Sequence, residues 1–298
     1  MRKRRIVFST RLNHDVMTHL INNLKQLKEF ELILHNPQRD FFCLSDMPNS
    51  FKKADFIIVK VRNECSIDLL HFAKLYNIPT LHDIDTVLLC KNKIALDYVL
   101  RKIIIENKKD LQNFLIPNSW NHSLTDVNRF KEWASNKLPI VIKSHYQHDK
   151  YNRFNFLVQE IEEIDKFCKM YEQFLYYDVY IQKFIESDGF ERKVYVIGEK
   201  VFGIKRENPI YLYLREKTDN IDVGLIERKE FEITEEIRIL SKILSMELKL
   251  KIFGFDLVKP VNQNKYYLID LNDFPSFKGI PNIEHTLSNF IRDYVLDL

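Results

Sequence analysis

The sequence predicts a mixed fold, with a small parallel α/β domain over about the first 85 residues and an α+β region behind it. Three observations support this prediction. The chain opens with a β-α-β pattern, and its second half carries β-branched and aromatic runs joined by tight turns. Hydrophobic residues make up 45% of the 298 residues, which is enough for one large core or two ordinary ones.

The opening β-α-β pattern continues through the first domain. We predict strands at residues 5–9, 30–35, 54–60 and 78–82, and helices at residues 12–29 and 65–77. Farther along the chain we predict helices at residues 91–106, 121–134, 159–174, 234–248 and 282–295. The remaining strands are predicted at residues 139–143, 177–185, 192–197, 201–206, 252–258 and 265–271.

Composition excludes several classes of protein. The formal charge of +3 gives no reason to expect nucleic-acid binding. All six glycines follow residue 188, which excludes a Walker P-loop and a Rossmann G-x-G-x-x-G fingerprint. The four cysteines form no C-x-x-C pair, and no run approaches the ~20 apolar residues of a membrane span. The apolar run after the basic N-terminus is too short for a signal peptide. The scattered cysteines suggest neither a zinc knuckle nor a disulfide framework, so we expect a cytoplasmic protein.

Two aspartates carry the clearest chemical signal. A hairpin centred on Gln263 sets Asp256 opposite Asp270, and Asn272 lies on the same face, opposite Gly254, around an open space. Ile252, Val258 and Leu268 are expected on that face too, so two like charges would lie on an apolar surface. A divalent cation resolves the conflict, and oxygen ligands of this kind suit Mg²⁺. The alternative is a solvated hairpin.

A second hairpin carries the opposite charge. A turn at residues 198–200 is expected to set Lys193 opposite Lys205, with Arg206 adjacent, so that an anion would lie between them. The alternative is a hydrated basic hairpin. Lys143 ends an apolar strand, where a nucleotide phosphate or a buried acid would be its partner. The polar loop behind it contains His145 and His148, which either bind anions or are simply exposed.

Taken in order, these elements resemble the ATP-grasp superfamily: a strand ending in Lys143, a hinge at residues 180–185, Lys193 within a strand, then D…D-x-N. The resemblance implies that two α+β subdomains clamp ATP behind an N-terminal α/β domain on the substrate side. The domains would then be residues 1–88, 89–184 and 185–298, the last with the metal site. Residues 269–279 resemble the inositol 1,3,4-trisphosphate 5/6-kinase family, and more distantly the RimK and glutathione synthetase ligases.

The resemblance implies roles residue by residue. It assigns ATP binding to Lys91, Lys143, Gln182, Phe184 and Ile185, and Mg²⁺ binding, as two ions with Mn²⁺ as a substitute, to Asp256, Asp270 and Asn272. It assigns the polyol phosphate to Lys60, His148, Arg153, Lys193, Arg206, Asn272 and Ser276, and catalysis to Lys143, Lys193 and Arg206. Two positions depart from the family pattern, because Arg153 stands where a second histidine is usual and Ser276 replaces a glycine.

We therefore expect a monomeric kinase that transfers the γ-phosphate of ATP to a hydroxyl of an inositol phosphate or similar small anionic polyol phosphate. Such a reaction depends on positioning and on charge stabilisation, and it requires no strong general base. The alternative is a carboxylate–amine ligase that acts through an acyl phosphate, with Arg215 as a candidate ligand of that group. A third reading is an inactive ATP-grasp module used as a scaffold.

Overall fold

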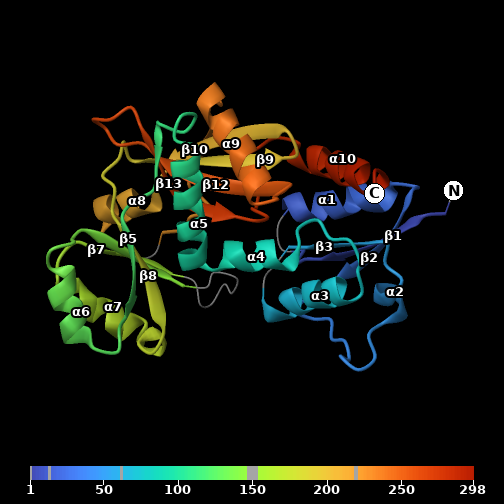
Figure 1. Cartoon of the computed structure of the whole chain (residues 1–298), viewed down its shortest axis with the longest axis horizontal. Coiled ribbons are helices and arrows are strands. Elements are labelled where there is room, and N and C mark those ends of the chain that lie inside the picture. The colour runs from blue at the N-terminus through green and yellow to red at the C-terminus, as the bar shows by residue number, and fades with distance from the viewer. Residues whose placement is uncertain (1, 13–14, 61–62, 146–153, 218–220) are drawn as a thin grey trace.

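The computed structural model describes residues 2–12, 15–60, 63–145, 154–217 and 221–298. Three β-sheets follow one another along the long axis of the molecule (Figure 1). A three-stranded sheet lies at one end, a six-stranded sheet in the middle and a four-stranded sheet at the other end. Within the described residues, no helix combines the length and the apolar character needed to cross a membrane.

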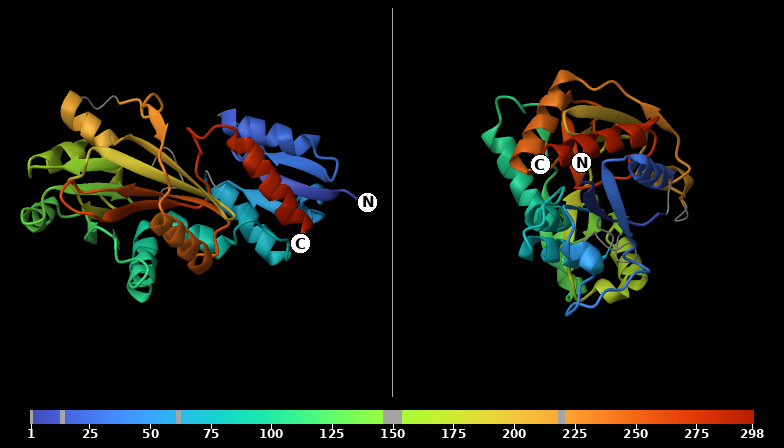
Figure 2. Two further views of the ribbon diagram at one scale, coloured as in Figure 1. Left: turned by 90° about the horizontal axis from the view of Figure 1, so that it is seen from above. Right: turned by 90° about the vertical axis from the view of Figure 1, so that its right-hand side faces the viewer.

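The first sheet confirms the predicted parallel α/β unit. Its strands β1 (Arg4–Ser9), β2 (Phe30–His35) and β3 (Phe56–Val59) are parallel in the order β2-β1-β3. The helices of this region are α1 (Asp15–Gln26), α2 (Asn49–Lys52) and α3 (Glu64–Leu75). The C-terminal helix α10 (Ile283–Leu296) lies beside α1 and shares its core (Figure 2). The last helix of the chain therefore completes the first core.

The six-stranded sheet is antiparallel except at one edge. Its strands are β11 (Arg228–Glu230), β10 (Lys200–Glu207), β9 (Phe190–Ile197), β12 (Ile252–Val258), β13 (Tyr266–Asn272) and β4 (Phe114–Leu115), in that order. Only the pair between β13 and β4 is parallel among the described strands of this sheet. Helices α5 (Lys93–Glu106) and α9 (Glu235–Glu247) bury their apolar side chains against one face of the sheet.

The four-stranded sheet has the order β5 (Ser119–Ser123), β8 (Asp178–Lys183), β6 (Ile140–Ser144) and β7 (Asn155–Val158), and all its pairs are antiparallel. Its core contains side chains of α6 (Val127–Ala134), α7 (Glu163–Met170) and the short 3₁₀ helix η1 (Glu172–Phe174). Helices α4 (Ile84–Lys91) and α8 (Pro209–Glu216) are the remaining elements of the described residues.

Several predicted elements are wrong in detail. The predicted helix 121–134 begins as strand β5, because its first residues pair with β8, and α6 starts only after the Asp126 cap. The predicted helix 91–106 is confirmed as α5 from Lys93 onward, where the side chain of Asn92 caps it, whereas Lys91 is the last residue of the separate helix α4. Residues 78–82 contribute a single bridge to β3. The domain boundaries after residues 88 and 184 stay predictions.

Candidate active site

A cavity of about 600 Å³ lies between the four-stranded and six-stranded sheets. This volume falls within the range of small-molecule sites. Strands β6, β7 and β8 line it from one side, and β9, β10, β12 and β13 line it from the other, together with α8. Eight of the predicted site residues line it: Lys143, Gln182, Phe184, Ile185, Lys193, Arg206, Asp256 and Asp270.

The hairpin of β12 and β13 has the predicted register at its polar end. Asp256 lies opposite Asp270, and Gly254 lies opposite Asn272, whose Nδ2 donates to Asp270 Oδ2 at 3.2 Å. The predicted open space at Gly254 is wrong. A Cβ there would lie 2.9 Å from Pro275 Cγ and 3.0 Å from Tyr195 Cδ1. Glycine is thus required for the close packing of the chain that follows β13.

Each of these aspartates is held by a lysine. Lys193 Nζ donates to Asp256 Oδ2 at 2.5 Å, and Lys93 donates to Asp270 Oδ1. Burial raises the pKa of Asp256, and the neighbouring carboxylates of Glu191 and Asp270 add to this rise, although Lys193 opposes it. Asp256 is therefore a buried acid that requires positive charge close by, and the half-buried Asp270 lies opposite it.

The donor set of the hairpin fits a magnesium ion. Asp256, Asp270 and Asn272 offer carboxylate and amide oxygens, which are hard ligands. Within the described residues, no group of three or more His, Cys, Asp or Glu side chains forms a metal site. Any ion held here would thus take only part of its coordination from protein carboxylates, as Mg²⁺ does when phosphates and water supply the rest.

The predicted register of the second hairpin is wrong by one residue. Ile197 pairs with Lys200, so the turn is the two residues Gly198 and Glu199, and Gly198 has a φ of +57°. Lys193 consequently lies opposite Ile204. Lys205 lies on the other face, where its Nζ is 3.9 Å from the centre of the Phe190 ring. The two lysines do not face one another, so the predicted anion between them loses its basis.

The shifted register brings a different set of charges together. Glu191 lies on the same face as Lys193, and it accepts from Lys193 Nζ at 3.2 Å and from Arg206 Nε at 2.8 Å. Burial acts to raise the pKa of Glu191, but Lys193 and Arg206 outweigh it and lower the pKa. Glu191 therefore stays ionised, and it neutralises part of the positive charge that the family resemblance assigns to the substrate.

Lys143 reaches the cavity from β6, the opposite sheet. Its Nζ donates to Gln182 Oε1 at 2.7 Å and to the backbone oxygen of Ile269 at 3.1 Å, and both acceptors are neutral. Burial is the main reason why the pKa of Lys143 falls to about 8. This ammonium group is poorly compensated, as expected of a group that binds an anion.

The other predicted residues lie elsewhere. Lys60 is buried and donates to the backbone oxygens of Phe274 and Pro275, the latter at 2.6 Å. Lys91 forms an ion pair with Asp273. Lys60, Lys91, Asn272 and Ser276 are outside the described lining of the cavity. His148 and Arg153 lie outside the described residues, and Ser276 is half-buried.

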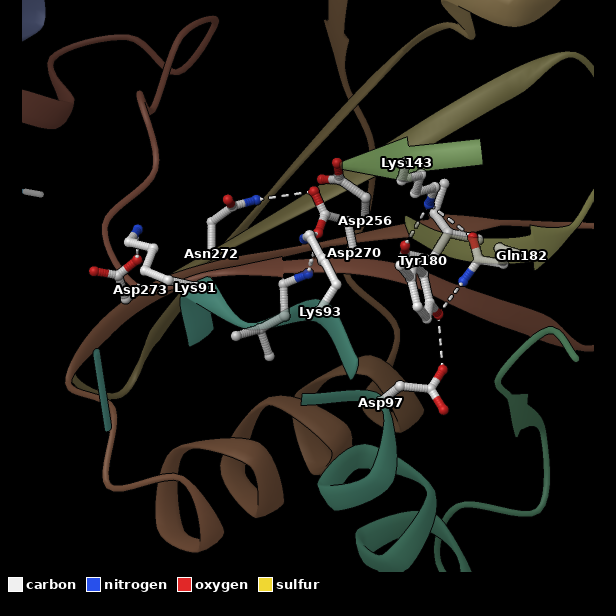
Figure 3. A network of polar contacts seen from close by, with 12 residues as sticks. Lys91, Lys93, Asp97, Lys143, Tyr180, Gln182, Asp256, Asp270, Asn272 and Asp273 are labelled. Carbon is white, nitrogen blue, oxygen red and sulfur yellow. Dashed lines mark hydrogen bonds and ion pairs between the residues drawn. The ribbon is translucent and has the colours of Figure 1, made fainter. Parts of the chain in front are cut away.

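Sequence reasoning missed a set of residues beside the cavity. Figure 3 shows Lys93 and Asp97 on α5, near Asp270 and Tyr180 respectively. The spacing of Lys93 and Asp97 places them on one helix face, and Tyr180 shares a face of β8 with Gln182. These spacings were readable in the sequence. The contacts were not, because they join segments far apart along the chain.

Comparison with known proteins gives two kinds of likeness. The sequence model of the inositol 1,3,4-trisphosphate 5/6-kinase ATP-grasp domain matches residues 213–293. Inositol-tetrakisphosphate 1-kinase 1 of Arabidopsis thaliana is 25% identical over 166 residues, which are 45% of this chain and 52% of that protein. The matched part thus spans about half the length of the curated relative.

Solved structures resemble nearly the whole chain. D-alanyl-alanine synthetase A from Vibrio cholerae has a TM-score of 0.71 at 15% identity, covering 100% of this chain and 98% of the other. A RiPP-associated ATP-grasp ligase from Chryseobacterium gregarium, in complex with ADP and a leader and core peptide, has a TM-score of 0.66 at 16% identity, covering 99% and 97%. The chain therefore has the fold of these ATP-grasp ligases, and residues 213–293 resemble the ATP-grasp domain of the inositol 1,3,4-trisphosphate 5/6-kinase family.

Proposed function

We propose that this protein is an ATP- and Mg²⁺-dependent kinase that transfers the γ-phosphate to a hydroxyl of an inositol phosphate or similar polyol phosphate. One observation carries the proposal above the others: the opposed carboxylates of Asp256 and Asp270 share a cavity with the under-compensated ammonium of Lys143. Such a combination suits a metal-bound polyphosphate. The likeness of residues 213–293 to the inositol kinase family supports the choice of acceptor.

The cavity residues divide naturally between nucleotide and acceptor. Lys143 and Gln182 come from the four-stranded sheet, and we assign them to ATP together with Phe184 and Ile185. Lys143 would then donate to charged phosphate oxygens instead of the neutral oxygens of the Gln182 side chain and the Ile269 backbone. Mg²⁺, when bound to Asp256, Asp270 and Asn272, supplies positive charge to the phosphates.

We assign the acceptor to the side of Lys193 and Arg206. Both cations bind Glu191 in the protein alone, so an incoming phosphate would compete with a carboxylate for them. Each phosphate of the acceptor needs a cationic side chain to bind it, and Lys193 and Arg206 are already paired with Glu191. We therefore expect an acceptor that carries few phosphates. The acceptor hydroxyl itself needs only to be held in line with the γ-phosphate.

The ligase alternative rests on the whole-chain likeness to ATP-grasp ligases. Its candidate acyl-phosphate ligand, Arg215, is 59% exposed and pairs with Glu207 and Glu216 at the end of α8. Arg215 is outside the described lining of the cavity. These positions favour the kinase over the ligase.

A product assay separates the two reactions. ADP and free phosphate are measured in parallel with Mg²⁺-ATP and either polyols and their phosphates, or amino acids and short peptides. ADP without free phosphate, formed only with polyols, is the expected result for a kinase. ADP with equal free phosphate, dependent on an amine and a carboxylate, would establish the ligase and refute the proposal.

A further inference from the structure

We propose that Tyr180 and Asp97 are positioning residues that fix the orientation of the Gln182 amide and, through it, the ammonium group of Lys143. The inference rests on the proposed function only in requiring that the cavity bind ATP. Neither residue lines the cavity of about 600 Å³ between the two sheets, the nucleotide cavity of the proposal. They explain why the Gln182 amide turns its oxygen, and not its nitrogen, toward Lys143.

A continuous chain of hydrogen bonds leads from the cavity to α5 (Figure 3). Lys143 Nζ donates to Gln182 Oε1 at 2.7 Å, and Gln182 Nε2 donates to the Tyr180 hydroxyl at 3.1 Å. The Tyr180 hydroxyl in turn donates to Asp97 Oδ2 at 2.7 Å. Each of these groups is buried, so water does not easily replace a missing partner.

The direction of the chain is set from the Asp97 end. Arg101, Ser119 and Tyr180 all donate to the Asp97 carboxyl group, so the Tyr180 hydroxyl is left with lone pairs toward Gln182. Burial, together with Asp97, raises the pKa of Tyr180, which keeps the hydroxyl protonated. Gln182 must then offer its NH₂ group to Tyr180 and its oxygen to Lys143. The reverse orientation would set two donors against each other at Lys143.

Asp97 is itself held firmly. Arg101 Nε donates to Asp97 Oδ1 at 2.6 Å, and Ser119 Oγ donates to Asp97 Oδ2 at 2.8 Å. Because Arg101 also donates to the backbone oxygen of Pro117, the carboxylate is anchored to the chain entering β5 as well as to α5. A charge-assisted network with satisfied members is a rigid support for the groups that depend on it.

The same face of α5 also reaches the carboxylate hairpin. Lys93, one helical turn before Asp97, donates to Asp270. A cavity of about 20 Å³, lined by Lys93, Asp97, Tyr180, Gln182 and Asp270, lies between the two contacts. This is about the space of one water molecule. One helix face therefore supports groups from both sheets of the nucleotide cavity.

The test is a double-mutant cycle on nucleotide affinity. Binding of Mg²⁺-ATP is measured by calorimetry, without an acceptor, for the unaltered protein, Tyr180→Phe, Gln182→Ala and the double variant. Tyr180→Phe is expected to weaken binding about tenfold, the effect of one lost hydrogen bond on a buried partner. In the Gln182→Ala background the same change is expected to alter affinity less than about twofold, because Tyr180 acts through Gln182.

Two further variants complete the design. Asp97→Asn keeps an oxygen that accepts from Tyr180, so it should weaken binding less than Tyr180→Phe, with the melting temperature recorded alongside. Tyr98→Phe makes the same chemical change on an exposed residue of α5 and should leave affinity unchanged. A Tyr180→Phe protein that melts earlier but binds ATP normally, or equal effects in both backgrounds, would overturn the inference. Failure of the unaltered protein to bind ATP would instead refute the proposed function.

Discussion

Replacing Lys143 by methionine should stabilise the protein at neutral pH while it destroys nucleotide binding. The pKa of Lys143 falls from 10.5 to about 8, chiefly through burial. At about 1.4 kcal/mol per pH unit, keeping this group charged in the folded protein costs about 3 kcal/mol at pH 7. Methionine removes that cost but leaves Gln182 Oε1 and the Ile269 oxygen without a donor, at about 1 kcal/mol each. The net expectation is a gain of about 1 kcal/mol, or about 2 °C in Tm.

The pH dependence makes the prediction specific to Lys143. A lysine whose pKa is lower in the folded state binds fewer protons there than in the unfolded chain. Stability of the unaltered protein should therefore rise between about pH 8 and pH 10.5, a gain that Lys143→Met lacks. Thermal unfolding should show that the Lys143→Met protein is the more stable of the two at neutral pH and the unaltered protein is the more stable at the alkaline end of this range. Parallel curves for the two proteins would refute the reasoning, because they would mean that burial does not penalise this charge.

Three further predictions concern the charged residues of the cavity. Asp270→Asn should reduce ADP formation more than about a hundredfold, because it removes a carboxylate ligand of Mg²⁺. The melting temperature should stay close to the original, because Lys93 keeps an amide oxygen as its hydrogen-bond partner. Full activity would contradict the assignment of Asp270 to the metal. Lys193→Ala should raise KM for the acceptor more than KM for ATP in steady-state kinetics, whereas an effect on ATP alone would move this lysine to the nucleotide. Glu191→Gln should lower the acceptor KM several-fold, since it removes the carboxylate that Lys193 and Arg206 share, while Asp256 still holds Lys193; an unchanged KM would show that Arg206 does not bind the acceptor.

The polar end of the first hairpin was predictable, because a polar turn lies midway between Asp256 and Asp270 and the apolar runs on both sides limit the pairing. The register shift between Asp256 and Leu257 was not predictable, and it sets Leu268 opposite Leu257 instead of Val258. The second hairpin was not predictable, because a two-residue turn and a three-residue turn are both compatible with residues 198–200. The difference of one residue moves Lys205 to the opposite face and brings Arg206 beside Glu191.

Long-range contacts account for the other differences. Lys91 and Lys93 look alike in sequence, but α4 ends at Lys91 and α5 begins at Lys93. Because of this break between the helices at Asn92, Lys91 pairs with Asp273 and Lys93 pairs with Asp270. Lys60 was assigned to substrate, yet it binds the backbone after β13, more than 200 residues away. No local pattern records such a partner. The same holds for β5, which looks helical alone but is extended because β8 offers it an edge.

The most direct test of the central claim is phosphorus NMR of a reaction of the protein with Mg²⁺-ATP and a polyol phosphate, with Asp270→Asn as the matched control. We predict a new phosphomonoester signal that grows as ATP is converted to ADP, no accompanying inorganic phosphate, and neither change in the control. Conversion of ATP to ADP with inorganic phosphate and no new phosphomonoester, under any acceptor offered, would contradict the kinase account.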